Sequence, residues 1–340
     1  MIYLIPPDPI TLPADLPAWR ADDAKFNFAL EKYAIEELDV GPSYFLFWRT
    51  TPTLMIGRYQ NTLAQINMPY ARANEIDIVR RITGGGTIYT DPNGWQFSFI
   101  VRNPGERRIE FSEFTKPILA ALHSLGVDAQ FSGRNDLTID GKKFSGNAQY
   151  VRHDVVLHHG SLLFDTDLEA LVRALNVDDE KIVAKGIQSV RQRVTNIADY
   201  LPQKITSLAF RDRMLSFLLA DMQTYTLTER DIRRVIELRA AQFDQWDWNF
   251  GKDPEFNATR EGRFAGGKLS AHVFVENGQI ASIRFYGDFF AKEELEQLQN
   301  TLVGCRYEPD AVRQALIDER APDCFYQITL DELFSCIIDA

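Results

Sequence analysis

Three consecutive glycines, Gly84–Gly86, constrain the fold of this chain more than any other feature. Glycine loses more conformational freedom on folding than any other residue, so a run of three indicates a place that needs bare backbone. The glycines follow the strand-like run DIVRRIT and precede the β-rich run TIYT. A dinucleotide fingerprint or a P-loop would open a helix at this point. The sequence therefore predicts a strand-to-strand loop whose N–H groups can form a concave anion site.

Two arginines, Arg80 and Arg81, stand directly before this loop. Successive side chains of a strand point to opposite faces, so we expect at most one of them to enter a pocket beside the glycines. The sequence does not decide which one.

A second segment, GRNDLTIDGKKFSGNAQY, predicts a hairpin with Asp140-Gly141 as its two-residue turn. In that register Thr138 pairs with Lys143, Leu137 with Phe144 and Asp136 with Ser145. One face then carries Asp136, Thr138, Lys143 and Ser145, while Lys142 is solvated beside an apolar face. The hairpin thus predicts Lys143 as the pocket lysine, although a slip of one residue would reverse that choice. Gly146 adds a point of close approach beside the polar face.

His158 and His159 are neighbours on a predicted strand and are expected to face opposite ways, so they cannot share one metal ion. No His, Asp or Glu cluster has zinc spacing, and no Gly-x-Ser-x-Gly elbow is present. All three cysteines, Cys305, Cys324 and Cys336, lie near the end of the chain. A cysteine nucleophile in the main site is therefore not expected, and the odd number predicts a reduced, cytoplasmic location.

The 340 residues exceed one ordinary core and predict two domains, at 1–248 and 255–340. Hairpins mixed with helices indicate an α+β fold rather than a doubly wound parallel sheet. The expected helices are 21–38, 67–76, 113–127, 165–176, 292–302, 311–318 and 330–338, and the pattern around 207–240 is helical as well. The expected hairpins are 87–102, 133–150 and 268–288, with further strands at 43–50, 53–60, 77–83 and 154–164.

A net charge of −11 argues against nucleic acid as the main partner and leaves room for a local pocket that binds a small anion. The N-terminal run MIYLIPPDPITLP has no basic region and is broken by prolines, so it does not read as a signal peptide. No uncharged run reaches the length of a membrane span, and we expect no membrane partner.

Five motifs occur in order: TLMIGRYQN, RRITGGGTIYTD, GRNDLTIDGKKFSGNAQ, HHGSLLF and AKGIQSVRQRVTNI. Together they closely resemble the lipoate–protein ligases over nearly the whole chain, including the entry WDWNFGKDPEF to the C-terminal region. The resemblance implies a large domain with the biotin/lipoate ligase fold, a mixed sheet flanked by helices, followed by a small α+β accessory domain.

The resemblance also implies a two-step reaction. Lipoate and MgATP would give lipoyl-AMP and pyrophosphate, and the lipoyl group would then pass to a lysine ε-amine of an acceptor domain. The acceptors would be E2 subunits of 2-oxoacid dehydrogenases or the glycine cleavage H protein, and the enzyme would work as a monomer. The acyl tail would need an apolar tunnel, for which FLFW and IYT…WQFSF supply candidate side chains.

By the same resemblance, Arg58 matches a nucleotide-contacting arginine and Lys143 a lysine that touches both the phosphate and the acyl carbonyl. Lys143 is the predicted catalytic residue, and Asp136 is the candidate Mg²⁺ ligand. The predicted substrate-binding residues are Arg58, Arg81, Gly84, Gly85, Gly86, Thr87, Ile88, Asp136, Lys143, Ser145, Gly146 and His159.

The chain departs from many relatives at Thr87-Ile88, where they have Ala-Val, and at Thr90, where they have histidine. These departures bear on acyl-chain preference. The alternatives are a transferase that moves octanoyl or lipoyl groups between proteins without ATP, and a lipoate-binding sensor without turnover. The transferase is disfavoured because this chain has no cysteine before Cys305 and retains the accessory domain. The retained Arg58 and Lys143 disfavour the sensor, and a biotin ligase is disfavoured because its Gly-Arg-Gly-Arg type of loop is absent.

Overall fold

The structure is a computed structural model. It describes residues 1–7, 16, 18–102, 109–152, 155–175, 190, 192–250 and 258–338. Half of the sequence motif at 184–197 falls outside this part, since residues 184–189 and 191 are not described. The second half of the entry to the C-terminal region, residues 251–256, lies outside it as well.

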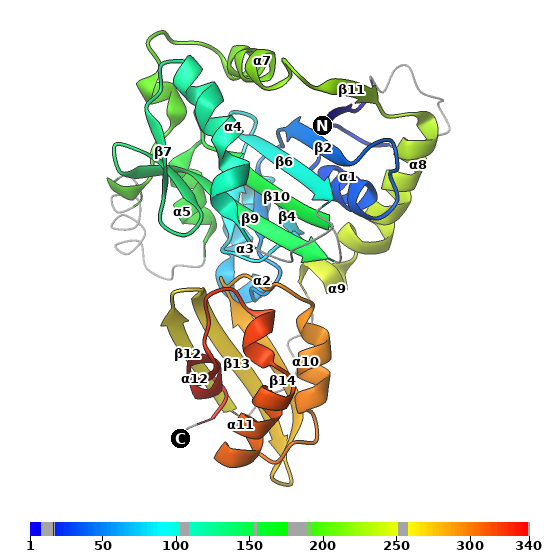
Figure 1. Cartoon of the computed structure of the whole chain (residues 1–340). Coiled ribbons are helices and arrows are strands. Elements are labelled where there is room, and N and C mark those ends of the chain that lie inside the picture. Colours follow the sequence, from blue (N-terminus) through cyan, green and yellow to red (C-terminus); the bar gives the residue numbers. More distant parts are fainter. Residues whose placement is uncertain are drawn as a thin grey trace.

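The chain folds into a larger N-terminal unit and a smaller C-terminal unit (Figure 1). The strands of the larger unit are β1 (Ile2–Ile5), β2 (Ser43–Trp48), β3 (Thr53–Ile56), β4 (Asp77–Arg80), β5 (Ile88–Thr90), β6 (Trp95–Arg102), β7 (Ala129–Ser132), β8 (Asp136–Ile139), β9 (Lys142–Arg152), β10 (Val155–Leu162) and β11 (Gln223–Thr226). Its helices are α1 (Ala24–Glu36), α2 (Thr62–Gln65), α3 (Met68–Ala73), α4 (Phe111–Ser124), α5 (Leu168–Ala174), η2 (Ile197–Tyr200), α7 (Ser207–Leu218), α8 (Glu229–Leu238), η3 (Arg239–Phe243) and α9 (Trp246–Asn249).

An eight-stranded mixed sheet in the order β11-β1-β2-β6-β10-β9-β8-β7 forms the centre of the larger unit. Strand β1 is parallel to both β11 and β2, and the other pairs are antiparallel. Helices α1 and α8 bury one face in a core around Phe28 and Leu157. Helices α4 and α7 bury the other face around Phe97 and Phe210. The mixed sheet between helical layers confirms the predicted α+β class.

The predicted hairpin at 87–102 is wrong, because β5 and β6 do not pair. The turn itself forms, since the Asp91 carboxylate accepts hydrogen bonds from the N–H groups of Asn93 and Gly94. However, β5 joins β3 and β4 in a separate three-stranded sheet, while β6 lies between β2 and β10. The first six residues of β6 are all buried, so it needs sheet neighbours and packing on both faces. The glycine loop therefore connects the two outer strands of the small sheet.

The hairpin at Asp140-Gly141 forms, with positive φ at both turn residues, +50° and +75°. Ile139 pairs with Lys142 and Thr138 with Lys143, as predicted. A β-bulge then shifts the register, so that Leu137 pairs with Ser145 and Asp136 with Gly146. The predicted Leu137–Phe144 and Asp136–Ser145 pairs are wrong, because a bulge inserts one extra residue on one strand. Gly146 takes the place on the Lys143 face that Ser145 was expected to occupy.

The helical pattern predicted around 207–240 is interrupted by a strand, which the prediction did not include. Helices α7 and α8 are separated by β11, an edge strand that pairs in parallel with β1. The four residues of β11 are mostly exposed and polar, so they lack the alternation that marks a strand in sequence.

No helix in the described part of the chain is long and apolar enough to cross a membrane.

The smaller unit is a three-stranded antiparallel sheet covered by helices. Its elements are β12 (Ala258–Phe264), β13 (Gly267–Glu276), β14 (Gln279–Gly287), α10 (Leu295–Leu302), α11 (Pro309–Asp318), η4 (Ala321–Cys324) and α12 (Leu330–Ser335). The hairpin turn at Asn277-Gly278 is as predicted, again with positive φ at both residues. The unit has its own apolar core, and we call it the accessory unit.

Candidate functional site

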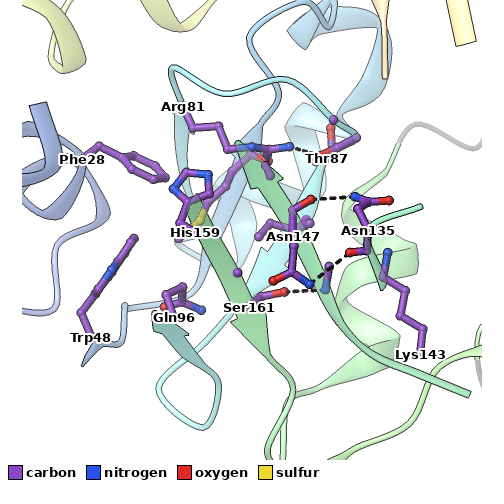
Figure 2. Close-up of a pocket in the computed structure, with 17 residues that line it drawn as sticks. Phe28, Trp48, Arg81, Thr87, Gln96, Asn135, Lys143, Asn147, His159 and Ser161 are labelled. Carbon is purple, nitrogen blue, oxygen red and sulfur yellow. Dashed lines mark hydrogen bonds between the residues drawn. The ribbon is translucent and has the colours of Figure 1, made fainter. Parts of the chain in front are cut away.

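One pocket brings the two predicted motifs together (Figure 2). Its cavity of about 120 Å³ lies over the large sheet, and two walls enclose it. We call residues 81–88 the glycine-loop wall and residues 135–148 the hairpin wall. The lining residues are Phe28, Trp48, Met55, Arg81, Gly85, Gly86, Thr87, Ile88, Gln96, Asn135, Lys143, Gly146, Asn147, Ala148, His159, Gly160 and Ser161.

The three glycines of the loop differ in what a side chain at each position would meet. A Cβ at Gly84 would lie 2.3 Å from the carbonyl oxygen of Phe289, so this glycine lets the accessory unit approach. Gly85 has φ +91°, a conformation that other residues rarely adopt, and its N–H donates to Phe289 O at 3.2 Å. A Cβ at Gly86 would meet nothing closer than 3.9 Å. Gly86 is therefore the glycine whose bare backbone the protein itself does not require.

Arg81 lines the pocket, but its guanidinium is directed at the glycine loop. It donates to the carbonyls of Gly84 (2.9 Å), Gly86 (2.7 Å) and Met55 (2.8 Å), and its Nε donates to Thr83. The side chain is buried, and this burial, aided by the nearby Arg80 charge, lowers the pKa of Arg81 to about 10. Arg80 turns away to the carbonyls of Gly57, Gln60 and Trp248. The expectation that at most one arginine enters the pocket is confirmed.

The hairpin wall presents Lys143 at the pocket. Its Nζ lies 2.7 Å from Asp136 Oδ1, and both side chains are more than a third exposed. A Cβ at Gly146 would lie 3.1 Å from Lys143 Nζ, so the glycine makes room for the lysine along this face. Lys142 does not line the pocket. Ser145 is buried and does not line the pocket either.

Two asparagines that we did not predict brace the hairpin wall. Asn135 Nδ2 donates to Asn147 O at 2.6 Å, and Asn147 Nδ2 donates to Asn135 O at 3.0 Å. Behind them His158 Nε2 hydrogen-bonds Asn147 Oδ1 and His158 Nδ1 hydrogen-bonds Gln149 Nε2. Because Gln149 donates, His158 is neutral with its proton on Nε2. Both asparagines stand inside the quoted motif, on the two arms of the predicted hairpin and well away from its turn, so no local pattern marked them.

His159 faces the opposite way, as predicted, and belongs to a buried network under the glycine loop. Its Nε2 lies 2.8 Å from Thr83 Oγ1 and its Nδ1 lies 3.0 Å from a carboxylate oxygen of Glu31. Glu31 also accepts from Ser98 at 2.6 Å, and Ser98 accepts from Trp48 Nε1. This network ties the sheet floor to Thr83, which in turn contacts Arg81.

Phe28, Trp48, Met55 and Ile88 give the other end of the pocket an apolar character. Of the candidate tunnel side chains, Trp48, Ile88 and Gln96 line it, whereas Phe45 and Phe47 pack into the core on the far face. Phe28 comes from helix α1 and could not have been predicted from the local pattern, since it reads as an ordinary core residue of an amphipathic helix.

Arg58 does not line this pocket. It lines a second cavity of about 260 Å³ at the accessory unit, where its guanidinium pairs with Glu294 at 2.5 Å. Tyr150 donates to the other oxygen of Glu294 at 3.0 Å. Thr87 Oγ1 donates to Gln60 Oε1 at 2.9 Å. The nucleotide contact of Arg58 stays a prediction.

The described residues offer few side chains for metal binding or for thiol chemistry at this pocket. The described residues contain no cluster of three or more His, Cys, Asp or Glu side chains that could hold a metal ion. The three cysteines are unpaired and belong to the core of the accessory unit or pack against it.

Comparison with known proteins fits this geometry. The family model described as "Lipoyl protein ligase A/B catalytic domain" matches residues 23–219, and "Bacterial lipoate protein ligase C-terminus" matches 253–337. "Lipoate-protein ligase LplJ" of Bacillus subtilis is 37% identical over 93% of this chain and 97% of its own length. The chain belongs to the lipoate–protein ligase family.

Solved lipoate ligases share the fold. Plasmodium falciparum LipL1, solved in complex with lipoate, superposes with a TM-score of 0.77 at 21% identity over 99% of both chains. A lipoate-protein ligase A bound with ATP gives a TM-score of 0.56 at 23% identity, covering 67% of this chain and 94% of that one. The predicted boundaries at 1–248 and 255–340 stay predictions, because residues 251–257 are not described.

Proposed function

We propose that this enzyme activates lipoate with ATP to lipoyl-AMP and then transfers the lipoyl group to a lysine ε-amine of an acceptor protein. The observation that carries the proposal is that one pocket is lined by Lys143 and the glycine loop together with apolar side chains at its other end. A ligand with an apolar tail and an anionic head fits that division. Solved ligases of the same fold are bound with lipoate or with ATP, which supports both substrates.

In the first step the lipoate carboxylate attacks the α-phosphorus of ATP, and pyrophosphate leaves. Two anions must approach, and negative charge builds on the phosphoryl oxygens. We expect Lys143 Nζ and the backbone N–H groups near Gly86, which line the pocket, to stabilise that charge. Arg81 contributes indirectly, because it holds the carbonyls of Gly84 and Gly86 and so fixes the direction of the loop.

In the second step the acceptor amine attacks the acyl carbonyl, an amide forms and AMP leaves. We expect Lys143 to polarise the carbonyl oxygen while the charge returns to AMP. No covalent enzyme intermediate is required, which agrees with the position of the cysteines in the accessory unit.

Mg²⁺ fits this site as a companion of the nucleotide rather than as a resident of a protein cage. Mg²⁺ is often held by substrate phosphates, waters and one or two carboxylates. Asp136 is the carboxylate next to Lys143 and is our candidate ligand. The ion would neutralise phosphate charge when bound with ATP.

The remaining assignments rest on the family resemblance. We propose E2 subunits and the glycine cleavage H protein as acceptors, Arg58 as a nucleotide contact, a monomeric enzyme and a cytoplasmic location. Three unpaired cysteines are consistent with a reducing compartment.

The test is to combine the purified chain with ATP, Mg²⁺ and lipoate and to measure pyrophosphate release. An apo acceptor domain is then added and its mass followed. We expect release that depends on lipoate and on Mg²⁺, and a lipoyl mass shift that depends on ATP. Acylation from a lipoylated or octanoylated donor protein without ATP would overturn the proposal in favour of a transferase.

A further inference from the structure

The apolar end of the pocket contains one polar side chain that neither the motifs nor the proposed chemistry uses. Gln96 lies on β6, directly opposite Trp48 of β2 on one side and Ser161 of β10 on the other. Figure 2 shows Gln96 beside Trp48, on the side of the pocket away from Lys143. The residue is 4% exposed and lines the pocket.

The two polar atoms of Gln96 are in different situations. Its Nε2 donates to Thr90 Oγ1 at 2.6 Å, which fixes the amide plane. Its Oε1 is buried and has no hydrogen-bond partner among the described residues. Buried carbonyl oxygens nearly always accept a hydrogen bond, and one without a donor lowers the stability of the folded protein. A donor on the bound substrate would remove that penalty.

The identity of that donor follows from the acyl chain of the substrate in the pocket, and this step rests on the proposed function. With its carboxylate beside Lys143, an eight-carbon acyl chain directs its far end toward Trp48 and Gln96. A methyl end has no donor. A closed dithiolane has two sulfurs but no S–H, whereas the reduced dithiol has two S–H groups. Phe28, Trp48 and Met55 also provide the aromatic and polarisable contacts that sulfur favours.

We propose that Gln96 is a specificity-determining residue that accepts a hydrogen bond from a thiol of the dihydrolipoyl chain, with Thr90 as the residue that positions it. The site then favours the reduced acid over both lipoate and octanoate, because the last two offer Gln96 Oε1 no hydrogen-bond donor. Thr90, one of the positions at which this chain departs from many relatives, thereby acquires a defined task.

The experiment compares dihydrolipoate under anaerobic reducing conditions with lipoate and octanoate. Dissociation constants come from calorimetry and kcat/KM values from pyrophosphate release. The wild type is expected to prefer dihydrolipoate over octanoate by about tenfold, which corresponds to about 1.4 kcal/mol. Gln96→Leu should remove the preference by weakening dihydrolipoate while leaving octanoate unchanged or improved. Thr90→Val should reduce the preference to an intermediate ratio.

Gln130→Leu is the matched control, since Gln130 is an exposed residue of β7 away from the pocket. It should leave every ratio unchanged. Equal affinity of the wild type for all three acids, or an equal loss for all three in Gln96→Leu, would overturn the inference. Should Gln96→Leu not fold, Thr90→Val decides, and an unchanged ratio in that variant overturns the inference too. Absence of pyrophosphate release with all three acids would instead count against the proposed function, and the calorimetric ratios would still decide the role of Gln96.

Discussion

The two walls of the pocket use positive charge in opposite ways. On the glycine-loop wall, Arg81 is 4% exposed and donates to three backbone carbonyls and a threonine hydroxyl. On the hairpin wall, Lys143 is 40% exposed and pairs with one carboxylate, Asp136. The arginine thus shapes the backbone that a ligand meets, while the lysine remains able to turn toward the ligand.

The backing of the walls differs as well. The accessory unit supports the glycine loop from behind through Phe289 and Phe290, whereas a neutral histidine and paired asparagines support the hairpin. A cation next to a glycine loop in sequence is therefore no guide to a cation next to the ligand. Burial and the direction of the donors decide its task.

Lys143→Ala should give the largest effect and separate catalysis from stability. Loss of one preorganised donor to a developing charge costs about 3–4 kcal/mol, so the rate of pyrophosphate release should fall roughly 10² to 10³-fold. Stability should change by less than about 1 kcal/mol, because the Lys143–Asp136 pair is partly exposed. Lys142→Ala is the matched control and should keep most activity. Equal losses from both lysines would show that the hairpin is not used as we propose.

Arg81→Met should show the reverse pattern. The variant leaves the carbonyls of Met55, Gly84 and Gly86 without their buried donor, so the free energy of unfolding should fall by about 3 kcal/mol. Denaturant unfolding measures this directly. If Arg81→Met proves as stable as the wild type and loses only turnover, the guanidinium serves the ligand and the contrast between the walls is wrong.

Two neighbouring glycines offer a finer test within one wall. Gly84→Ala would place a methyl group 2.3 Å from Phe289 O, and relief of that clash should cost about 2 kcal/mol. Gly86→Ala meets no atom within 3.9 Å and should change stability by less than about 0.5 kcal/mol. Its effect should fall on substrate affinity, measured as KM for ATP and lipoate. Unaltered kinetics in a stable Gly86→Ala variant would mean that the loop does not approach the ligand there.

Local signals accounted for most of what the sequence could predict. The turns at Asp140-Gly141 and Asn277-Gly278 formed because adjacent residues define them. Lys143 faces the pocket because only Lys142 separates it from the first of these turns. Partners distant in sequence could not be predicted. Strand β5 pairs with β3 rather than with β6, and a bulge after Lys143 moves Ser145 off the predicted face.

The same limit applies to the site. The glycine loop and the lysine stand in recognisable motifs, whereas Trp48 and Gln96 lie in runs that were only broad candidates for the tunnel, and Phe28 comes from the covering helix. Each of them has the pattern of a core residue in sequence. Only the three-dimensional structure shows that they line the pocket.

The smallest effect concerns the support of the hairpin wall and depends on pH. Burial, together with the neighbouring His159, lowers the pKa of His158 well below 6.5. At pH values between this lowered pKa and about 6.5, the unfolded chain binds a proton at this histidine that the folded chain does not. The free energy of unfolding therefore falls as the pH falls. The free energy of unfolding should drop by up to about 1 kcal/mol from pH 6.5 to 5.5 through this group. His158→Gln, compared with the wild type by urea unfolding at both pH values, should show a flatter slope. An identical slope in the two proteins would mean that His158 accepts a proton on Nδ1 in the folded protein despite the hydrogen bond from Gln149 Nε2, and that the hairpin wall is less rigidly braced than its hydrogen bonds indicate.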